Sequence, residues 1–349
     1  MKALVYTAVR KFELRDIAEP RPGPGEVLVR VAATGICGSD VHGFMGRSAR
    51  RNPGLVLGHE TVGTVQALGE GVDKAIAHTR VSVNPLISCG VCDACRTGRH
   101  NVCADWRLLG LDTTQGAFAE AVVVPVRNIL PLPEHVSDAM AVMIEPLANA
   151  IHLISHTPRQ AGMFPTACIF GGGTLGLSIL SVARAKGMRV IAVIEPNAAR
   201  AKVATELGAE NVLDPRAVDT VAEIKRMTGG HGVDVSIDAV GLAQTRQQTV
   251  ASLTRGGTAL FLGLEEGPAQ FDFFDLIRRE IRLQCSFGYN QTDFSAALDF
   301  VARSTGSGQA RGAADFTRWT DTLPLSDGQA AFERLIRDPG DRVKIALKP

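Results

Sequence analysis

Four of the chain's seven cysteines lie within residues 89–103, and their spacing predicts a metal site. They follow the pattern C-x2-C-x2-C-x7-C, formed by Cys89, Cys92, Cys95 and Cys103. Such a loop can fold four sulfurs around one tetrahedral ion, and an all-cysteine shell is typical of structural zinc. A redox switch and an iron–sulfur cluster are the alternatives. The bacterial ferredoxin pattern has three residues before its fourth cysteine and then a proline, whereas this chain has seven residues and then Ala104. Zinc is therefore favoured.

The other cysteines indicate a reducing compartment. Cys37, Cys168 and Cys285 are far apart and the total is odd, so no disulfide framework is expected. Residues 1–14 alternate like a strand and lack the apolar core and cleavage site of a signal peptide. No apolar run is long enough to span a membrane. We therefore expect a cytoplasmic protein without a membrane partner, in which Cys168 and Cys285 are buried apolar side chains.

A second set of residues suits a metal ion that performs chemistry. The segments G35-I-C-G-S-D-V-H42 and G58-H-E60 supply Cys37, His59 and Glu60. A thiolate, an imidazole and a carboxylate form the mixed set that is typical of a catalytic zinc with an open coordination position. Each residue alone is weak evidence, because single cysteines and histidines more often serve packing. Beside the four-cysteine loop they predict a second zinc site.

A glycine motif indicates a nucleotide site. Gly171, Gly173 and Gly176 form G-x-G-x-x-G after the strand-like run T166-A-C-I-F. The motif opens a predicted helix and lies 24 residues before Glu195, the acidic end of the next strand-like run. In such a motif the first glycine allows the turn, the second lets the backbone approach the pyrophosphate, and the third lets helix pack on strand. This context favours dinucleotide binding over glycines that serve packing alone.

The predicted elements that position these residues follow two different patterns along the chain. Up to about residue 145 short β-type runs alternate with Gly/Pro turns, which predicts a β-rich domain. From there to residue 285 strands and helices alternate, which predicts a doubly wound parallel sheet of the Rossmann type. The fold class is α/β. We assign residues 1–148 to the catalytic domain with both zinc sites, 149–285 to the nucleotide domain, and 286–349 to a return to the catalytic domain.

Composition excludes several other classes. The chain has 349 residues, 45% of them hydrophobic, which is enough to bury the cores of two domains. Its 37 basic and 36 acidic residues give a net charge of +1. Because nucleic-acid binding needs a basic surface, no nucleic-acid partner is expected.

These motifs together identify a family resemblance. The segments G35–H42 and G58–E60, the cysteine loop, G116-A-F-A-E, E145-P-L, the glycine motif and F261-L-G-L resemble the zinc-dependent medium-chain alcohol dehydrogenases along nearly the whole chain. Within them the resemblance is to the sorbitol, threonine and butanediol dehydrogenase branch. It implies a GroES-like β-rich catalytic domain, one structural and one catalytic zinc per chain, and an active site in the interdomain cleft.

The resemblance also implies residue roles in catalysis. Cys37 and His59 are expected to bind the catalytic zinc, and Glu60 and Glu145 compete for the remaining protein position. Asp40 resembles the carboxylate that orients the ligand histidine. Ser39 would pass the substrate proton through the nicotinamide ribose to His42 and on to water.

Further expectations concern the cofactor and assembly. Glu195 is expected to accept hydrogen bonds from the adenosine ribose and to favour NAD over NADP, although the nearby Arg200 could pair with a 2′-phosphate. A homotetramer is implied by the branch. The remaining predicted cofactor contacts are Gly171, Gly173, Leu175, Gly176, Leu262, Gly263, Leu264, Ser286 and Phe287.

The substrate is expected to be a secondary alcohol with further hydroxyls, such as a polyol or sugar acid, oxidised reversibly to a ketone. Sorbitol dehydrogenases carry an arginine–tyrosine pair where this chain has Gly288 and Tyr289, so the hydroxyl anchors differ. A butanediol- or threonine-type dehydrogenase is the alternative. A metal-free quinone reductase is disfavoured by Cys37 and G58-H-E60. A non-catalytic zinc protein on the same scaffold is the remote alternative.

Overall fold

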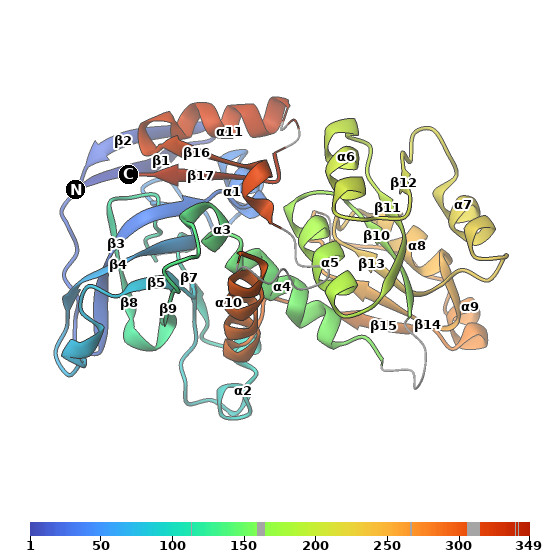
Figure 1. The fold of residues 1–349 in the computed structure, drawn as a ribbon, viewed down its shortest axis with the longest axis horizontal. Coiled ribbons are helices and arrows are strands. Elements are labelled where there is room, and N and C mark those ends of the chain that lie inside the picture. Colours follow the sequence, from blue (N-terminus) through green and yellow to red (C-terminus); the bar gives the residue numbers. More distant parts are fainter. Residues whose placement is uncertain (113, 159–164, 266, 306–314, 339, 341) are drawn as a thin grey trace. The chain divides into compact units, whose positions relative to one another are not determined.

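A seven-stranded sheet organises the first of two structural units (Figure 1). The computed structural model describes residues 1–112, 114–158, 165–265, 267–305, 315–338, 340 and 342–349. The first unit contains Met1–Glu145, the described part of Asn290–Gly308, and Asp315–Pro349; the second contains Pro146–Tyr289.

The seven strands of the first unit run in the order β16-β17-β3-β4-β5-β9, and β8 also pairs with β3. Only β16 and β17 are parallel to each other; the remaining pairs are antiparallel. The strands are β3 (Glu26–Gly35), β4 (Glu60–Leu68), β5 (Arg80–Val83), β8 (Ala121–Pro125), β9 (Ile129–Pro131), β16 (Thr320–Pro324) and β17 (Lys344–Lys348).

Smaller elements complete this unit. Two further two-stranded sheets consist of β1 (Lys2–Ala8) with β2 (Lys11–Asp16), and β6 (Leu86–Ile87) with β7 (Arg107–Leu108). Its α-helices are α1 (Gly38–Phe44), α2 (Asp93–Arg96), α3 (Asp138–Ala141), α10 (Gln291–Thr305) and α11 (Gly328–Arg337). Its 3₁₀ helices are η1 (Lys74–Ile76), η2 (His100–Val102), η3 (Val126–Asn128), η4 (Phe316–Trp319) and η5 (Leu325–Asp327).

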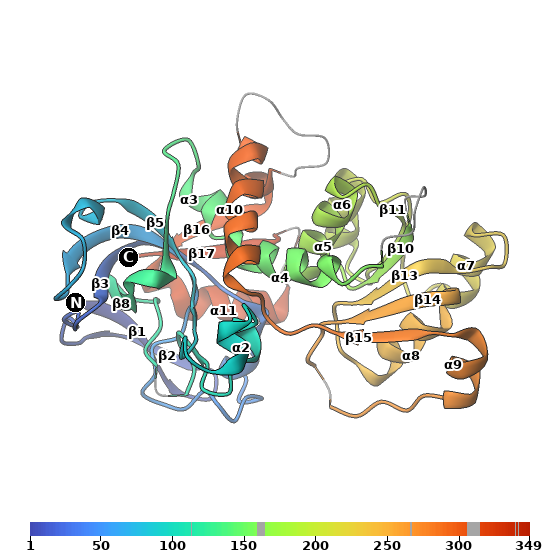
Figure 2. The same ribbon diagram turned by 90° about the horizontal axis from the view of Figure 1, so that it is seen from below.

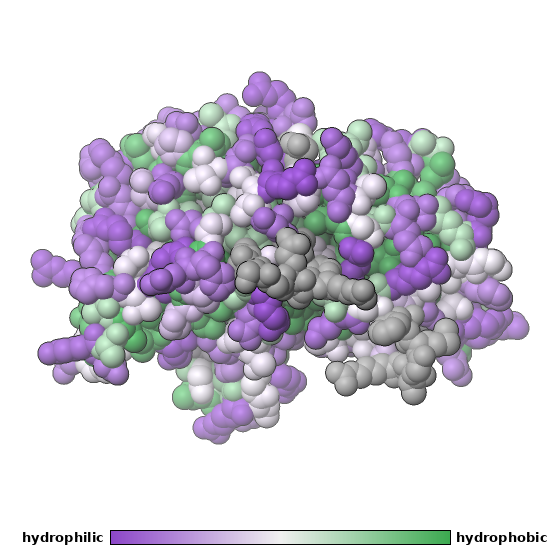
Figure 3. Space-filling view, viewed as in Figure 1, coloured by the Kyte–Doolittle hydropathy of each residue, from purple (hydrophilic) through white to green (hydrophobic). Residues whose placement is uncertain are grey.

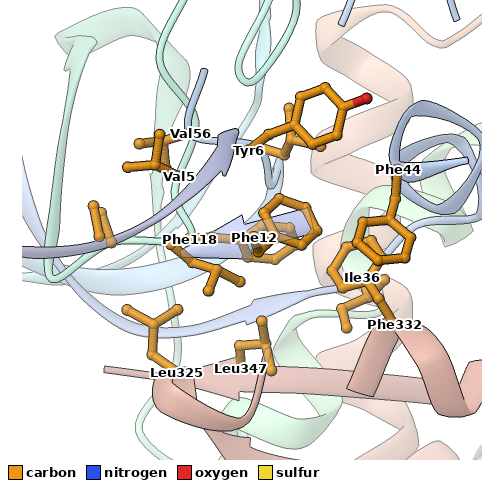
Figure 4. Close-up of a cluster of buried hydrophobic side chains, with 14 of the residues drawn as sticks. Val5, Tyr6, Phe12, Ile36, Phe44, Val56, Phe118, Leu325, Phe332 and Leu347 are labelled. Carbon is orange, nitrogen blue, oxygen red and sulfur yellow. The ribbon is translucent and has the colours of Figure 1, made fainter. Parts of the chain in front are cut away.

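An aromatic cluster holds α1, the helix that follows Cys37, in place (Figure 4). Phe44 of α1 stacks on Phe12 of β2, with ring centroids 5.1 Å apart. Phe332 of α11 lies 4.7 Å from Phe12 and 5.2 Å from Phe44. Ile36, just before Cys37, is buried in the same cluster. Burial of large aromatic side chains dominates core energetics, so this cluster fixes the segment that carries the predicted metal ligand.

The second unit is a six-stranded, all-parallel sheet in the order β12-β11-β10-β13-β14-β15. The order reverses between β10 and β13, as in a Rossmann fold. The α/β class and the Rossmann and GroES-like architecture expected from the sequence are confirmed. The strands are β10 (Thr166–Phe170), β11 (Arg189–Ile194), β12 (Val212–Leu213), β13 (Val233–Asp238), β14 (Leu253–Phe261) and β15 (Arg282–Cys285).

Helices cover both faces of this sheet, with α5 and α6 on one face and α8 and α9 on the other (Figure 2). Ile224 of α7, Val250 of α8 and Leu276 of α9 share one buried cluster with the strands. The helices are α5 (Thr174–Ala185), α6 (Ala198–Glu206), α7 (Thr220–Met227), α8 (Ala243–Ala251) and α9 (Phe273–Arg279). Helix α4 (Ile144–Ser155) begins in the first unit and continues into the second.

One cysteine expectation is wrong. Cys168 is fully buried in the central strand β10, as predicted, and burial raises the pKa of its thiol to about 12. Cys285 is exposed, although it too lies in a strand-like run. The reason is its place in the sheet: β15 is the edge strand, and Arg282 and Leu283 are exposed with it. Periodicity does not reveal which strand lies at the edge.

The surface shows mainly hydrophilic side chains on the face in Figure 3, with hydrophobic ones in small separate patches. No helix among the described residues is long and apolar enough to cross a membrane.

Candidate metal centres and nucleotide site

Strand register brings the first set of metal-ligand candidates together. Gly35 at the end of β3 is paired with Glu60 at the start of β4. Cys37 lies two residues after Gly35 and His59 one residue before Glu60, so the pairing brings them close together. One ligand atom from each of Cys37, His59 and Glu60 lies within 4.8 Å of the other two. His59 and Glu60 are buried, and Cys37 is half-buried. This set can hold a metal ion of the zinc type, with nitrogen, sulfur and oxygen ligands.

Gly35 makes room for the carboxylate of Glu60. A Cβ at Gly35 would lie 2.1 Å from Glu60 Oε2 and 3.1 Å from Lys344 Cδ. Any larger residue would therefore push these side chains away. The glycine of the G-I-C segment is thus a steric requirement of the site.

Asp40 supports His59 from behind. Its Oδ1 lies 3.5 Å from His59 Nδ1 and 3.2 Å from Arg51 Nη2, and its Oδ2 accepts a hydrogen bond from the backbone N–H of Cys37. Burial alone would raise the pKa of Asp40, but His59 and Arg51 outweigh it and lower that pKa to about 2. Burial likewise opposes the charged form of His59, yet Asp40 and Cys37 raise its pKa well above its usual value. The expected orienting role of Asp40 fits this geometry.

Two charged residues at the site were not predicted. Lys344 of β17 is 2% exposed and places Nζ 2.6 Å from Glu60 Oε2 and 2.7 Å from Glu60 Oε1. Burial opposes its charge, but Glu60, Cys37 and Glu145 raise its pKa. Arg51 is buried between Asp40 and Ser39, and its Nη2 donates to Ser39 Oγ at 3.0 Å. The signal for Lys344 was a charge within the apolar run V343-K-I-A-L347.

The relay residues and Glu145 have the following positions. Ser39 and His42 lie three residues apart in α1, so they share one face of that helix. Glu145 is the second residue of α4 and is half-buried. It is not part of the group whose ligand atoms lie within 4.8 Å. Its role therefore stays a prediction, as does the proton relay.

The four-cysteine loop has the geometry of a tetrahedral sulfur site. The sulfur atoms of the four cysteines all lie within 4.8 Å of one another. Cys89 Sγ and Cys95 Sγ are 3.9 Å apart. In a tetrahedral site with Zn–S bonds of ~2.3 Å the sulfurs lie about 3.8 Å apart. The set Cys89, Cys92, Cys95 and Cys103 therefore fits zinc.

Backbone hydrogen bonds prepare this loop for metal. The N–H groups of Val91 and Cys92 donate to Cys89 Sγ at 3.5 and 3.4 Å, and the N–H of Cys89 donates to Cys103 Sγ at 3.4 Å. The donors from Val91 and Cys92 lower the pKa of Cys89 to about 6. A thiolate is the form that binds metal, so the fold favours the binding state of Cys89.

The glycine loop of the second unit has the form expected for dinucleotide binding. Gly171 adopts φ +103°, which side chains rarely tolerate. A Cβ at Gly176 would lie 1.8 Å from the carbonyl oxygen of Gly171, so only glycine allows α5 to pack this closely. At Gly173 a Cβ would meet nothing nearer than Arg200 Nη1 at 4.0 Å. The space at Gly173 is open to a ligand, and α5 begins directly after it.

Glu195 is tied to this loop. It lies just past β11 and is 6% exposed. Its Oε2 accepts from the N–H of Gly172 at 2.7 Å and its Oε1 from the N–H of Asn197 at 2.7 Å. Asn197, rather than Glu195, caps α6, because its Oδ1 accepts from the N–H of Arg200. The structure thus brings Glu195 and Arg200 to the glycine loop.

The other predicted cofactor residues lie at the same edge of the sheet. Leu175 is the second residue of α5, and the others follow the carboxyl ends of β14 and β15. There the N–H of Ser286 donates to the carbonyl of Phe261 at 2.9 Å. Asp238 lies at the end of β13, the strand between β10 and β14, and accepts from the N–H groups of Val240 and Gly241. Asp238 was not predicted. The predicted residues placed along this edge are Leu175, Leu262, Gly263, Leu264, Ser286 and Phe287.

Comparisons with known proteins agree with these sites. A family model described as "Alcohol dehydrogenase GroES-like domain" matches residues 23–134, and one described as "Zinc-binding dehydrogenase" matches residues 174–303. L-threonine 3-dehydrogenase of Pyrococcus horikoshii is 38% identical over 76% of this chain and 76% of its own. Sorbitol dehydrogenase of Bacillus subtilis is 32% identical over 100% of this chain and 97% of its own.

A solved structure extends the comparison to the fold. A Sinorhizobium meliloti protein described as a zinc-binding dehydrogenase, solved bound to NADP, has a TM-score of 0.88 and 31% identity. The match covers 100% of this chain and 99% of that chain. A relative matches the whole chain, and both groups of candidate metal ligands are brought together by the fold. The chain therefore belongs to the zinc-binding medium-chain alcohol dehydrogenases.

Proposed function

We propose that the chain oxidises a secondary alcohol bearing further hydroxyl groups reversibly to a ketone, with zinc and NAD. The observation that carries this proposal is the close grouping of the half-buried Cys37 with the buried His59 and Glu60; Asp40 lies behind the histidine. A sulfur, a nitrogen and a carboxylate around one point suit a metal that keeps a position for substrate. The open glycine loop of the second unit suits the dinucleotide.

The residues of the chain would act as follows. When bound, zinc supplies a Lewis acid to the alcohol oxygen and the nicotinamide accepts the hydride. Cys37 and His59 hold the metal, with Glu60 or Glu145 as the third protein ligand. Ser39 takes the alcohol proton and His42 carries it onward to water. Arg51 donates to Ser39 Oγ, which leaves the hydroxyl hydrogen and one lone pair of Ser39 for proton transfer.

The four-cysteine loop is proposed to hold the second zinc of the chain. Its four sulfurs leave no position for a substrate, so this ion is structural. Its proposed role is to stabilise residues 89–103.

The proposed substrate class is a polyol or a sugar acid. Its support is the full-length similarity to a sorbitol dehydrogenase and the carboxylate in the metal group. Gly288 adopts φ +56°, a conformation that strains an arginine, so a cationic hydroxyl anchor is not expected at this position. L-threonine is the second candidate, because a threonine dehydrogenase is 38% identical.

NAD is the proposed cofactor because of Glu195. A 2′-phosphate at the end of β11 would meet this buried carboxylate, and like charges at close range repel. The related Sinorhizobium meliloti structure was solved with NADP. Membership of the family therefore does not decide between NAD and NADP, and the proposal for NAD rests on Glu195 of this chain.

We propose a homo-oligomer, with a tetramer as the expected size. The support is a group of exposed apolar side chains near the edge of the parallel sheet. They are Phe273, Phe274 and Ile277 of α9 and Leu283 of β15. An edge strand with apolar neighbours is a surface that a second copy can cover. Light scattering of the parent and of Ile277→Glu/Leu283→Glu tests this; a monomeric parent contradicts it.

A substrate panel tests the proposed activity. NADH formation is measured with polyols, sugar acids, vicinal diols, L-threonine and ethanol, for the parent and for His59→Ala. Activity with a polyhydroxy secondary alcohol that is lost in a folded His59→Ala protein is expected. A higher kcat/KM for ethanol than for every polyol, sugar acid and diol contradicts the substrate class. If the parent is as inactive as His59→Ala and binds no metal at Cys37, the result supports a non-catalytic zinc protein instead.

A further inference from the structure

Lys344 is a buried cation that the proposed reaction does not use. It is 2% exposed, and its Nζ donates to Glu60 Oε1 at 2.7 Å and to the carbonyl oxygen of Ile36 at 3.1 Å. Removing an ammonium from water is strongly unfavourable unless it is paired, and a buried pair rarely adds net stability over apolar residues of similar volume. A role at the site is therefore a better explanation than stability alone.

The sheet register places this cation at the metal group. β3 lies between β17 and β4, with Gly35 paired to Ala346 on one side and to Glu60 on the other. Because Gly35 has no side chain, Lys344 reaches across it to Glu60. The same carboxylate therefore lies within reach of Lys344 Nζ and of the ligand atoms of Cys37 and His59.

The charges of the group show what the lysine changes. A zinc ion of charge +2, the thiolate of Cys37 and the carboxylate of Glu60 add to zero. A carboxylate that is a full ligand of the metal fills a coordination position. It also lowers the capacity of the metal to accept electron density from an alcohol. A cation that holds both oxygens of Glu60 competes with the metal for that carboxylate.

We propose that Lys344 is a positioning residue that holds Glu60 beside the catalytic metal and keeps it from becoming a permanent ligand. One coordination position thereby stays available to the alcohol oxygen. This inference rests on the proposed function, because it needs a metal at Cys37 and His59. The opposite role, a lysine that presents Glu60 to the metal as a ligand, predicts the reverse outcome in the experiment below.

The test compares metal binding in Lys344→Met, which keeps the side-chain length and removes the charge. Lys344 is the side chain that pairs with the carboxylate of Glu60 in the described part of the chain. Without it that carboxylate is available to the metal, and the ammonium no longer repels the ion. We expect Zn²⁺ release to a chelator to slow about tenfold or more. We also expect the visible absorption of Co²⁺ at this site to weaken, because a further ligand raises the coordination number above four. The spectrum of His59→Ala, which retains the four-cysteine site, is subtracted throughout.

Two further variants locate the effect. Lys344→Arg should release zinc at the parent's rate, and Lys344→Met/Glu60→Gln should return to that rate, because the freed carboxylate is gone. Glu60→Gln alone should leave the cobalt spectrum of the parent unchanged, which tests the proposal even when Lys344→Met does not fold. Faster or unchanged release in Lys344→Met, or a changed spectrum in Glu60→Gln, overturns the inference. A parent that binds no Co²⁺ beyond the His59→Ala level contradicts the proposed function itself.

Discussion

The carboxylate of Glu195 accepts a hydrogen bond from the backbone N–H of Gly172 at 2.7 Å, which joins the end of β11 to the glycine loop after β10. The second oxygen of Glu195 accepts from the N–H of Asn197. A carboxylate has about four acceptor positions, so two remain for a ligand. Glu195 therefore positions the loop, and we propose that its remaining acceptor positions bind a ribose hydroxyl.

Replacing Glu195 by alanine is expected to reduce the preference for NAD over NADP about tenfold or more. The change removes acceptors for the ribose hydroxyls and relieves repulsion of a 2′-phosphate. The measurement is kcat/KM for both cofactors in parent and variant. Glu210→Ala is the control, because Glu210 is exposed and pairs with Arg189 on the same unit. A parent that prefers NADP, or a ratio indifferent to the change, rejects this role of Glu195.

The two glycines Gly173 and Gly176 are expected to respond differently to alanine. Gly176→Ala places a Cβ 1.8 Å from the carbonyl of Gly171 and should lower the melting temperature. Gly173→Ala finds no protein atom nearer than 4.0 Å, so stability should stay within about 0.5 kcal/mol of the parent. NAD affinity should nevertheless fall, because the methyl group occupies the approach to the pyrophosphate. Unchanged NAD binding by Gly173→Ala in a fluorescence titration would exclude the loop as the phosphate site.

Neighbouring arginines provide a matched test of the polar core around His59. Arg51, 5% exposed at its side chain, pairs with the buried Asp40, whereas Arg50, 45% exposed, pairs with the exposed Asp112. Arg51→Met leaves a buried charge on Asp40 and should reduce the free energy of unfolding by about 3–5 kcal/mol. Arg50→Met should reduce it by about 1 kcal/mol or less. Urea unfolding of the metal-loaded proteins measures both; equal losses would contradict the assigned burial.

The four-cysteine loop is expected to matter for folding, not for the chemical step. Cys92→Ser should remove one zinc per chain and lower thermal stability, because structural zinc binds small peptides with roughly 10–16 kcal/mol of apparent free energy. Cys285→Ser is the control, since Cys285 is an exposed thiol outside both metal groups. Metal analysis and calorimetry measure the outcome. A Cys92→Ser protein as stable as the parent, with unchanged zinc, counts against a structural metal.

Local patterns predicted the parts of this structure that local chemistry determines. The run T166-A-C-I-F forms β10 with the expected bounds, and the helix predicted to follow the glycine motif is α5. The spacing of the four cysteines is sufficient to anticipate their cluster, because the loop that carries them is short. Cys37, His59 and Glu60 meet because two strands pair at Gly35, and their residue types alone suggested a common site.

Contacts that depend on the tertiary fold were not predictable in the same way. Lys344 and Glu60 are 284 residues apart in the sequence, and nothing local pairs them. Arg51 lies in a polar stretch that reads as a surface loop, yet the fold buries it between Ser39 and Asp40. The exposure of Cys285 follows from the position of β15 at the sheet edge. Long-range pairing and sheet order, rather than residue type, decide these three cases.

We propose that the metal group of Cys37 and His59 and the dinucleotide act together in hydride transfer. The direct measurement is transfer of deuterium to NAD from a polyol labelled at the reacting carbon, followed by mass spectrometry of the reduced cofactor. The parent is expected to form deuterated NADH. His59→Ala is expected to form none while keeping its four-cysteine zinc and its NAD affinity. No labelled NADH from the zinc-loaded parent with any alcohol of the panel, or equal labelling by His59→Ala, would contradict the account.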